Sequence, residues 1–491
     1  MAHGLLTYAF AREHGIAFQP GEASGFLMRE TANVLALAEA VRAAGCVAPV
    51  KTLSDSAFDR ALSEIYAASA VAAPRDEAGH GDSLSRLIED MPQAEDLLAS
   101  DSEAPVIRLI NGLVADAIRA GASDIHVEPY EDRVSVRFRL DGVLDERVSL
   151  PLHLAPALVS RLKVMARLDI AERRVPQDGR VTLTLAGRGV DVRVSTLPSR
   201  HGERVVMRLL EKNSALMAID ALGMPAGVAA GYRRALNQPN GIILVTGPTG
   251  SGKTTTLYAG LTALNDQTRN ILTIEDPVEY AVDGIGQTQV NTRVGMTFAA
   301  GLRAILRQDP DIVMVGEIRD GETARIAVQA SLTGHLVLST VHTNSAAAAI
   351  ARLRDMGIES YLLASTLTAV LAQRLVRRLC PHCHEPYEAS EREQALAGAA
   401  GPLTLYAPRG CEACHHTGFA GRQGVYEIIM VDEGLRGLIH DNAREAELAR
   451  HAFASGGGLF EAGLELARDG VTTLAEVLRV CREEGERDAR L

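Results

Sequence analysis

A glycine-rich segment near the middle of the chain carries the residue types needed to bind a triphosphate. Residues 247–254 read Gly-Pro-Thr-Gly-Ser-Gly-Lys-Thr and fit the pattern G-x-x-x-x-G-K-[ST] without a mismatch. In such loops the backbone N–H groups surround the phosphates, the lysine reaches the β- and γ-phosphates, and the last hydroxyl ligates Mg²⁺. We predict a nucleoside-triphosphate site made of Gly247, Pro248, Thr249, Gly250, Ser251, Gly252, Lys253, Thr254 and Thr255.

Carboxylates follow two segments that have the pattern of strands. Residues 270–275 end in Glu275, and residues 311–315 lead to Glu317. The second segment fits a Walker B strand, although glutamate stands where aspartate is usual, so Glu317 can act on Mg²⁺ through water. Hydrolysis requires a carboxylate that orients the attacking water or takes its proton. We predict that Glu317 and Glu275 share this role.

Two further acids, Asp276 and Glu279, come directly after the first of these strands. We predict that they support the metal and the loop, so that the residues associated with magnesium are Thr254, Asp276, Glu279 and Glu317. The alternative for Glu317 and Glu279 is a helix cap or a solvated loop position, because loop carboxylates usually face water.

Histidines and arginines add further candidates. Residues 335–342 form an apolar strand with a histidine at each end, and His342, at the carboxyl end, is placed to sense a γ-phosphate. A single histidine at a strand end is more often a cap or a core residue. Arg303 and Arg307 are four residues apart and would share one face of a helix, where they act on phosphate, contact another subunit or simply face water.

Four of the six cysteines form two C-x-x-C pairs, Cys380 with Cys383 and Cys411 with Cys414, separated by 27 residues. In a reducing compartment such thiols favour metal ligation over disulfides. Four thiolates fill a tetrahedral shell and leave no open position, so we predict a structural Zn²⁺ site, with redox or incidental thiols as the alternative. Cys46 and Cys481 are expected to be ordinary buried or half-buried thiols.

The elements that must position these residues follow the order of an α/β domain. Residues 242–245 predict a buried strand before the loop, and residues 255–264 predict a helix whose positive end points at the phosphates. Earlier in the chain, residues 134–140 alternate as a strand, and residues 190–194 and 205–209 predict a hairpin. Arg193 and Arg208 project from that hairpin, where solvated strand charges are the simpler explanation.

Length and composition limit the possibilities. The 491 residues suggest about three domains. The 50 basic and 62 acidic residues give a net charge of −12, which argues against a motor that moves along a nucleic acid. No apolar run is long enough to cross a bilayer, and no signal peptide is evident, so we expect a cytosolic chain. A helix is expected at residues 55–67, and residues 73–102 are typical of a linker interrupted by a short helix from Ser83.

Together these residues resemble the secretion ATPase superfamily, and most closely the ATPases of type II secretion. The resemblance extends from about residue 100 onward and covers, in order, residues 123–128, 202–204, 247–256, 275–280, 303–320, 334–344, the paired C-x-x-C and 418–422. It implies that residues 275–279 are the family's aspartate box, that Glu317 is its Walker B glutamate, and that His335 and His342 form its histidine box. It also implies that Arg193, Arg208, Arg303 and Arg307 are directed at the nucleotide across domain and subunit interfaces.

The resemblance further implies an α/β fold with a RecA-like P-loop motor domain, which a PAS-like α+β domain and a small N-terminal domain precede. The implied parts are residues 1–72 (partner docking), 73–103 (linker), 104–215 (PAS-like), 216–225 (hinge), 226–378 (ATPase core), 379–424 (zinc subdomain) and 425–491 (helical). The expected assembly is a homo-hexamer that uses ATP, Mg²⁺ and Zn²⁺.

The function that the resemblance implies is ATP hydrolysis that powers pseudopilus assembly and type II protein secretion. The partners would be the cytoplasmic part of the inner-membrane protein GspL and the platform protein GspF, with the chain attached peripherally to the cytoplasmic face of that membrane and with no nucleic acid bound. A type IV pilus assembly ATPase is the alternative; a DNA-uptake motor and a zinc-held adaptor without turnover fit less well. Pilus-retraction ATPases usually lack the four cysteines.

Overall fold

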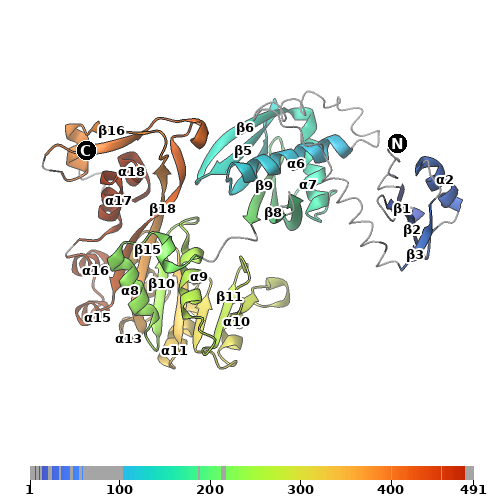
Figure 1. Cartoon of the computed structure of the whole chain (residues 1–491). Coiled ribbons are helices and arrows are strands. Elements are labelled where there is room, and N and C mark those ends of the chain that lie inside the picture. The colour runs from blue at the N-terminus through green and yellow to red at the C-terminus, as the bar shows by residue number, and fades with distance from the viewer. Residues whose placement is uncertain are drawn as a thin grey trace. The chain divides into compact units, whose positions relative to one another are not determined.

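The computed structural model describes residues 103–481 apart from 186–187, 212–216, 400 and 455, together with residues 6, 10–11, 14–19, 25–32, 35–44, 48–54 and 58 (Figure 1). The predicted linker up to residue 102, most of the predicted helix at 55–67, Cys46 and residues 212–216 of the second connector lie outside the described residues. No helix in the described part of the chain is both long and apolar enough to cross a membrane.

The N-terminal residues form a small three-stranded sheet in the order β1-β2-β3, from β1 (Ile16–Gln19), β2 (Gly25–Arg29) and β3 (Val50–Leu53), with α2 (Leu35–Ala44). Phe18 and Phe26 are paired across β1 and β2, and their ring centroids are 5.1 Å apart. Both rings are buried, so this short segment has an apolar core of its own.

A six-stranded sheet follows, with strand order β6-β5-β4-β9-β8-β7. Its elements are α6 (Glu103–Arg119), β4 (Asp124–Pro129), β5 (Arg133–Leu140), β6 (Val143–Pro151), α7 (Ala155–Met165), β7 (Gln177–Leu185), β8 (Arg188–Ser199) and β9 (Gly202–Glu211). The predicted strand at 134–140 and the predicted hairpin are therefore both confirmed, because β8 and β9 are neighbours in the sheet.

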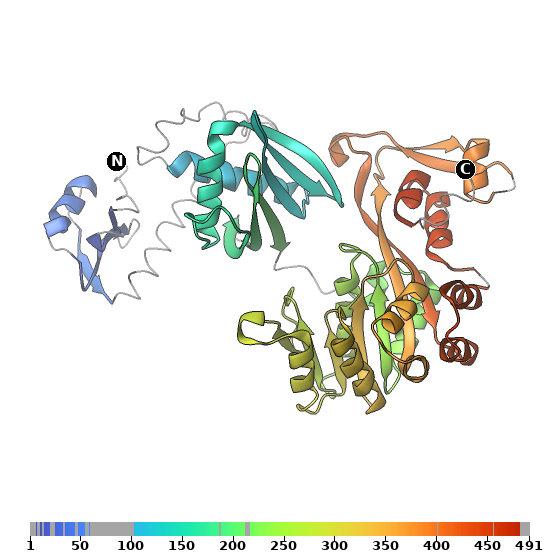
Figure 2. The ribbon, with the colours of Figure 1, turned by 180° about the vertical axis from the view of Figure 1, so that it is seen from behind.

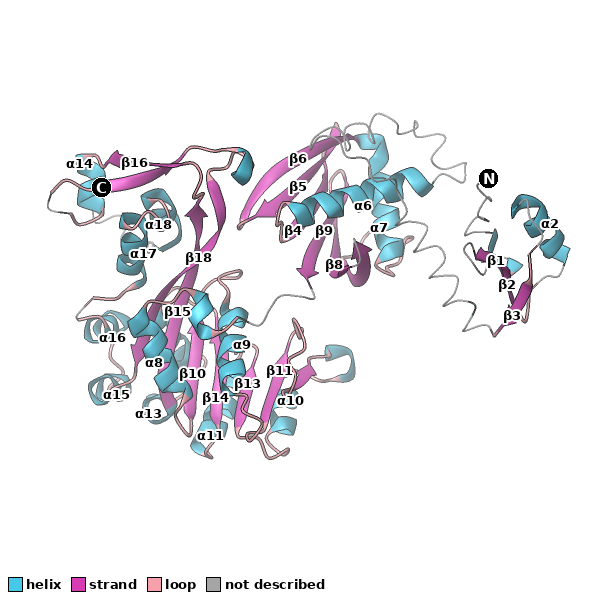
Figure 3. Cartoon of the chain, viewed as in Figure 1, coloured by secondary structure: helices cyan, strands magenta, loops and turns pink. Residues whose placement is uncertain are grey.

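The largest sheet has seven strands in the order β12-β11-β13-β14-β10-β15-β18 (Figure 3). The strands are β10 (Gly241–Thr246), β11 (Ile271–Glu275), β12 (Gly286–Gln289), β13 (Ile312–Val315), β14 (Leu336–Val341), β15 (Leu367–Leu379) and β18 (Phe419–Met430). All neighbours are parallel except β18, which is antiparallel to β15. This confirms the predicted α/β class.

Helices cover both faces of this sheet, which explains why its central strands are apolar on both sides. Ile243 and Val245 face α8 (Ala226–Leu236) and α9 (Lys253–Leu264), which lie in front of the sheet in Figure 1. Ile242 and Leu244 pack on the other side, which Figure 2 shows from behind. The helices there are α10 (Phe298–Ile305), α11 (Gly321–Leu332), α12 (Ala346–Asp355) and α13 (Ser360–Thr366).

The chain leaves this sheet and returns to it around the cysteines. β15 leads directly into Cys380, and after the cysteine segment β18 runs back along β15. Between them lie β16 (His384–Glu388) and β17 (Thr404–Pro408), which form a two-stranded sheet, and α14 (Glu391–Leu396). The prediction that residues 425–491 are helical was wrong for its first residues, because β18 continues to Met430 and supplies an edge strand of the sheet.

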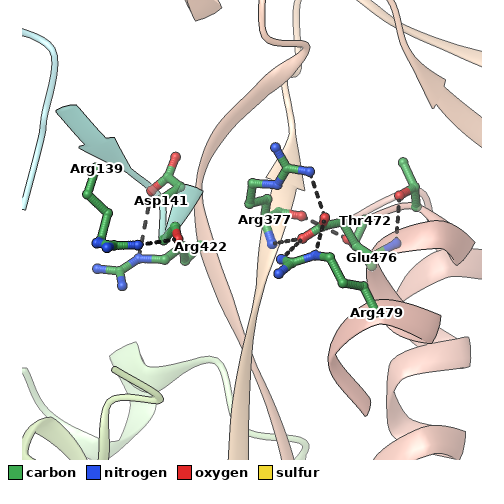
Figure 4. A network of polar contacts seen from close by, with 9 residues as sticks. Arg139, Asp141, Arg377, Arg422, Thr472, Glu476 and Arg479 are labelled. Atoms are coloured by element: carbon green, nitrogen blue, oxygen red, sulfur yellow. Dashed lines mark hydrogen bonds and ion pairs between the residues drawn. The ribbon is translucent and has the colours of Figure 1, made fainter. Parts of the chain in front are cut away.

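Helices α15 (Glu433–His440), α16 (Glu445–Ala452), α17 (Leu459–Arg468) and α18 (Leu474–Cys481) complete the described part of the chain. Charged side chains fix the end of β15 to α18 (Figure 4). The buried Glu476 carboxylate accepts hydrogen bonds from Arg377 at 2.6 Å and from Arg479 at 2.7 Å. The Thr472 hydroxyl donates to the Arg377 carbonyl at 2.8 Å, so both side chain and backbone of β15 are held there.

Candidate functional site

The predicted phosphate-binding loop connects β10 to α9 and adopts a conformation that requires glycine. Gly247 has φ 149° and Gly252 has φ 85°. A Cβ atom on Gly247 would overlap the carbonyl oxygen of Gln373. Helix α9 begins at Lys253, directly after Gly252, which has a left-handed conformation. The N–H groups of the first helical turn therefore lie at the end of the loop, where they can bind an anion.

Lys253 lies on this loop, and its side chain folds back over it. The ammonium Nζ donates to the carbonyls of Gly247 at 2.8 Å and Pro248 at 3.0 Å. Burial lowers the pKa of Lys253 to about 8, although the nearby Glu317 carboxylate opposes the shift. The ammonium therefore occupies the concavity in which phosphate oxygens would be its natural partners.

Glu317 and His342 meet at the carboxyl edge of the sheet. Thr246 at the end of β10 pairs with Val341 at the end of β14, so Gly247 and His342 follow at neighbouring positions. Glu317 comes just after β13, its side chain is 14% exposed, and its Oε2 lies 3.3 Å from His342 Nε2. Its other oxygen is paired with the Arg319 guanidinium. Burial, followed by the charge of Lys253, lowers the pKa of His342, which favours the neutral imidazole.

Glu275 has a different environment, although it was predicted to act jointly with Glu317. It is the last residue of β11 and is 3% exposed. Its Oε1 accepts from Thr273 Oγ1 at 2.6 Å and from Gln287 Nε2 at 3.1 Å, and its Oε2 accepts from the Tyr258 hydroxyl. Glu275 is more deeply buried than Glu317 and is held by three hydrogen bonds, whereas the partners of Glu317 are the exposed side chains of Arg319 and His342, so Glu275 is better suited to hold the strand end than to take a proton.

One pocket brings the predicted residues of the largest sheet together. It is lined by the loop from Thr249 to Thr255 and by Glu275, Asp276, Glu279, Glu317 and His342. Asp276, Glu279 and Thr254 are exposed, so their oxygens are available to a ligand. Hydroxyl and carboxylate oxygens are the hard donors that Mg²⁺ prefers, so the donor set of this pocket fits that ion.

The predicted arginines do not all lie as expected. Arg303 is on α10 and pairs with Glu322 at 2.6 Å. Arg307 lies beyond the end of α10, so the prediction that both arginines share one helix face was wrong. The helix ends at Ile305 and turns, and Arg307 donates to the Arg303 carbonyl at 2.9 Å.

Arg193 and Arg208 lie on β8 and β9 of the six-stranded sheet, as the hairpin prediction required. Arg208 Nε donates to the buried Asp124 carboxylate at 2.9 Å, although the arginine side chain itself is 56% exposed. The action of these two arginines on a nucleotide stays a prediction.

His335 is separated from this pocket by the whole of β14, because it precedes the strand and His342 follows it. Its Nδ1 lies 2.8 Å from the Ala330 carbonyl and 3.1 Å from the Thr333 hydroxyl. The two histidines of the predicted histidine box therefore lie at opposite ends of β14, and of these two only His342 lines the pocket.

The four cysteines of the two C-x-x-C pairs converge, and their ligand atoms all lie within 4.8 Å of one another. The Sγ atoms of Cys380 and Cys411 are 3.9 Å apart, and Cys414 Sγ lies 3.7 Å from those of Cys383 and Cys411. Ligands at the usual Zn–S distance in a tetrahedron lie about 3.8 Å from each other, so this arrangement fits Zn²⁺. The N–H groups of Cys411 and Gly418 donate to Cys414 Sγ at 3.2 Å, and these hydrogen bonds stabilise the thiolate form that binds a metal.

Several residues that contact the site were not predicted from the sequence. Tyr258 and Gln287 bind Glu275, Arg319 pairs with Glu317, and Gln373 binds the phosphate loop. Arg319 is the only one with a local signal, since it lies two residues after Glu317. Gln373 is more than 100 residues from the loop in sequence, and only the pairing of β15 with β10 brings it there.

Comparison with known proteins agrees with this geometry. A family model described as "Type II/IV secretion system protein" matches residues 99–479, and a second model, for a domain of "GSPII protein E", matches residues 5–66. Type II secretion system protein E of Pseudomonas aeruginosa is 55% identical over 484 residues, which are 98% of this chain and 96% of that protein. Type II secretion system ATPase E of Vibrio cholerae is 56% identical over 436 residues, which are 88% and 87% of the two chains.

Among solved structures, the crystal structure of the pilus retraction motor PilT with bound ADP is similar with a TM-score of 0.51 and 26% identity, and the match covers 78% of this chain and 99% of that one. The chain therefore belongs to the type II/IV secretion system family and, within it, to the type II secretion system E proteins.

Proposed function

We propose that this chain hydrolyses ATP to ADP and phosphate and that this hydrolysis powers type II protein secretion. The observation that carries the proposal is the pocket in which Lys253, Glu317 and His342 lie beside a glycine-rich loop at the carboxyl edge of a parallel sheet. Identities of 55% and 56% to type II secretion proteins support the process that it serves. The direct test is to measure protein secretion by a strain in which this chain is the only source of the secretion ATPase.

Within this site, the loop from Gly247 to Thr255 holds the phosphates, and Lys253 exchanges its loop carbonyls for phosphate oxygens. Thr254, Asp276, Glu279 and Glu317 provide oxygen atoms that would hold Mg²⁺, directly or through water. When bound, the ion supplies positive charge to the phosphate oxygens.

Glu317 activates the attacking water, and His342 orients the Glu317 carboxylate. The 3.3 Å contact between them and the lowered pKa of His342 support these roles, because a neutral imidazole can donate one hydrogen bond without adding charge. Glu275 shares in this chemistry as a positioning residue, since Tyr258 and Gln287 already occupy its oxygens.

The working assembly is a homo-hexamer in which arginines complete the site across interfaces. Arg303 and Arg307 do not line the chain's own pocket, and the Arg303 side chain is 51% exposed, which supports action on a neighbouring subunit. We propose that Arg193 and Arg208, on β8 and β9, also act on the nucleotide. Arginines supplied in this way stabilise the charge of the transferred phosphoryl group.

The cysteine cluster holds a structural Zn²⁺. We expect about one zinc per chain in the purified protein, and its loss in a Cys411→Ser/Cys414→Ser variant with a lowered melting temperature, because metal binding contributes to folding. Elemental analysis measures the metal. Cys481→Ala, which removes a buried thiol outside the cluster, should keep the zinc. Full zinc occupancy in the double serine variant would contradict the assignment.

The chain acts on the cytoplasmic face of the inner membrane through GspL, with GspF as a further partner. The match of residues 5–66 to a domain of a type II secretion protein supports docking by this end of the chain. The full chain should be retained by immobilised GspL cytoplasmic domain and not by the corresponding domain of a pilus system. Equal retention by both, or retention by the pilus domain alone, would favour the pilus assembly alternative.

A further inference from the structure

The side chain of Gln373 lies beneath the phosphate-binding loop and contacts it at two points. Gln373 is in the middle of β15 and is 1% exposed. Its Nε2 donates to the Ser251 carbonyl at 2.5 Å, and its Oε1 accepts from the Thr256 hydroxyl at 2.7 Å. One amide group therefore connects the end of the loop to the first turn of α9.

The backbone of β15 is equally close to the loop. A Cβ atom on Gly247 would overlap the Gln373 carbonyl oxygen, and one on Gly252 would lie 3.0 Å from its Nε2. The two glycines at the ends of the loop thus face the same residue of the neighbouring strand. β15 cannot shift along β10 at this point without displacing the loop.

The contact at Ser251 also determines the direction of a backbone N–H group that can donate a hydrogen bond to a phosphate. In a trans peptide the C=O and the next N–H point in opposite directions. Because the Ser251 carbonyl is directed at Gln373, the N–H of Gly252 is directed away from β15. Backbone N–H groups of this loop are the phosphate donors, so Gln373 sets the orientation of one of them.

The terminal amide of glutamine matches both partners. The Ser251 carbonyl needs a donor and the Thr256 hydroxyl needs an acceptor, and the terminal amide offers one of each. Thr256 is 0% exposed, so losing the amide would leave buried polar groups unpaired. Methionine has a similar length and provides neither hydrogen bond.

From these contacts we infer that Gln373 is a positioning residue that holds the phosphate loop in its nucleotide-binding conformation and thereby sets the affinity for the nucleotide. This inference rests on the proposed ATPase function, which the same assays test separately.

The test is binding of MgADP to the full-length protein by isothermal titration calorimetry, with phosphate release measured in parallel. Gln373→Met should raise the Kd for MgADP about tenfold, as the loss of two buried hydrogen bonds predicts. The KM for ATP should rise by a similar factor while kcat changes less than about threefold, because the loop binds ground and transition states alike.

A double-mutant cycle separates this role from general destabilisation. Thr256→Val should raise the Kd as well. The Kd of the Gln373→Met/Thr256→Val variant should not exceed the higher of the two single-variant Kd values, because both changes remove the same contact. Gln394→Met, on α14, removes a glutamine amide that donates to the Ala389 carbonyl and should leave Kd, KM and kcat unchanged.

An unchanged Kd in Gln373→Met, or additive effects in the double variant, would overturn the inference. If Gln373→Met does not fold, the Kd values of Thr256→Val and Thr256→Ser are compared instead, since serine retains the hydroxyl and valine does not. Equal Kd values in these two variants would also overturn the inference. Absence of phosphate release by the wild-type protein would count against the proposed function instead, and the MgADP titration would still test Gln373.

Discussion

Replacing Lys253 with alanine is expected to reduce phosphate release by the purified protein by roughly 10²–10³-fold, in line with the loss of one group that stabilises developing negative charge. The ammonium lies on the loop that surrounds the phosphates, where it donates hydrogen bonds to two backbone carbonyls. The substitution leaves those carbonyls free to solvent and removes the one positive side chain that the loop itself provides. Steady-state phosphate release at saturating MgATP measures the effect.

The matched control is Lys51→Ala, which removes an exposed lysine from β3 in the N-terminal sheet and should leave phosphate release unchanged. Hydrolysis at wild-type rate by Lys253→Ala would show that another part of the chain binds the phosphates, and the assignment of the loop would fail.

Replacing Glu317 with glutamine is expected to lower kcat by roughly 10²–10⁴-fold while ATP still binds, because the amide has the shape of the carboxylate but cannot accept a proton from water. Phosphate release gives kcat, and calorimetric titration with MgADP shows whether binding persists.

Glu275→Gln provides the comparison in the same pocket. Its carboxylate is bound by Thr273, Gln287 and Tyr258, so its replacement should disturb the strand end and lower kcat much less than the change at Glu317. A larger loss of kcat in Glu275→Gln than in Glu317→Gln would reverse the assignment of the base.

Local patterns in the sequence predicted the parts of the site whose residues lie close together along the chain. The loop at 247–254 and the strand endings at Glu275, Glu317 and His342 were all recognisable, since each depends on one apolar strand followed by polar residues. Because parallel strands bring their carboxyl ends to one edge of a sheet, these endings could be expected to converge.

Features that depend on the order of strands in the sheet could not be predicted from local patterns in the sequence. Gln373 is an ordinary polar residue within an apolar run until the pairing of β15 with β10 places it under the loop. β18 joins the sheet only after the whole cysteine segment, so its pairing is a long-range event. The error at Arg307 was local: residues 301–308 fit a helix by spacing, but α10 ends at Ile305.

Secretion by a strain in which this chain is the only source of the ATPase tests the central claim most directly. The strain's own gene is deleted and replaced by the wild-type gene or by Glu317→Gln, and the exported type II substrate is measured in the culture medium at matched protein levels. We predict wild-type export with the first and none above the deletion background with the second. Normal export with a Glu317→Gln protein that does not hydrolyse ATP would contradict the conclusion that hydrolysis at this site powers secretion.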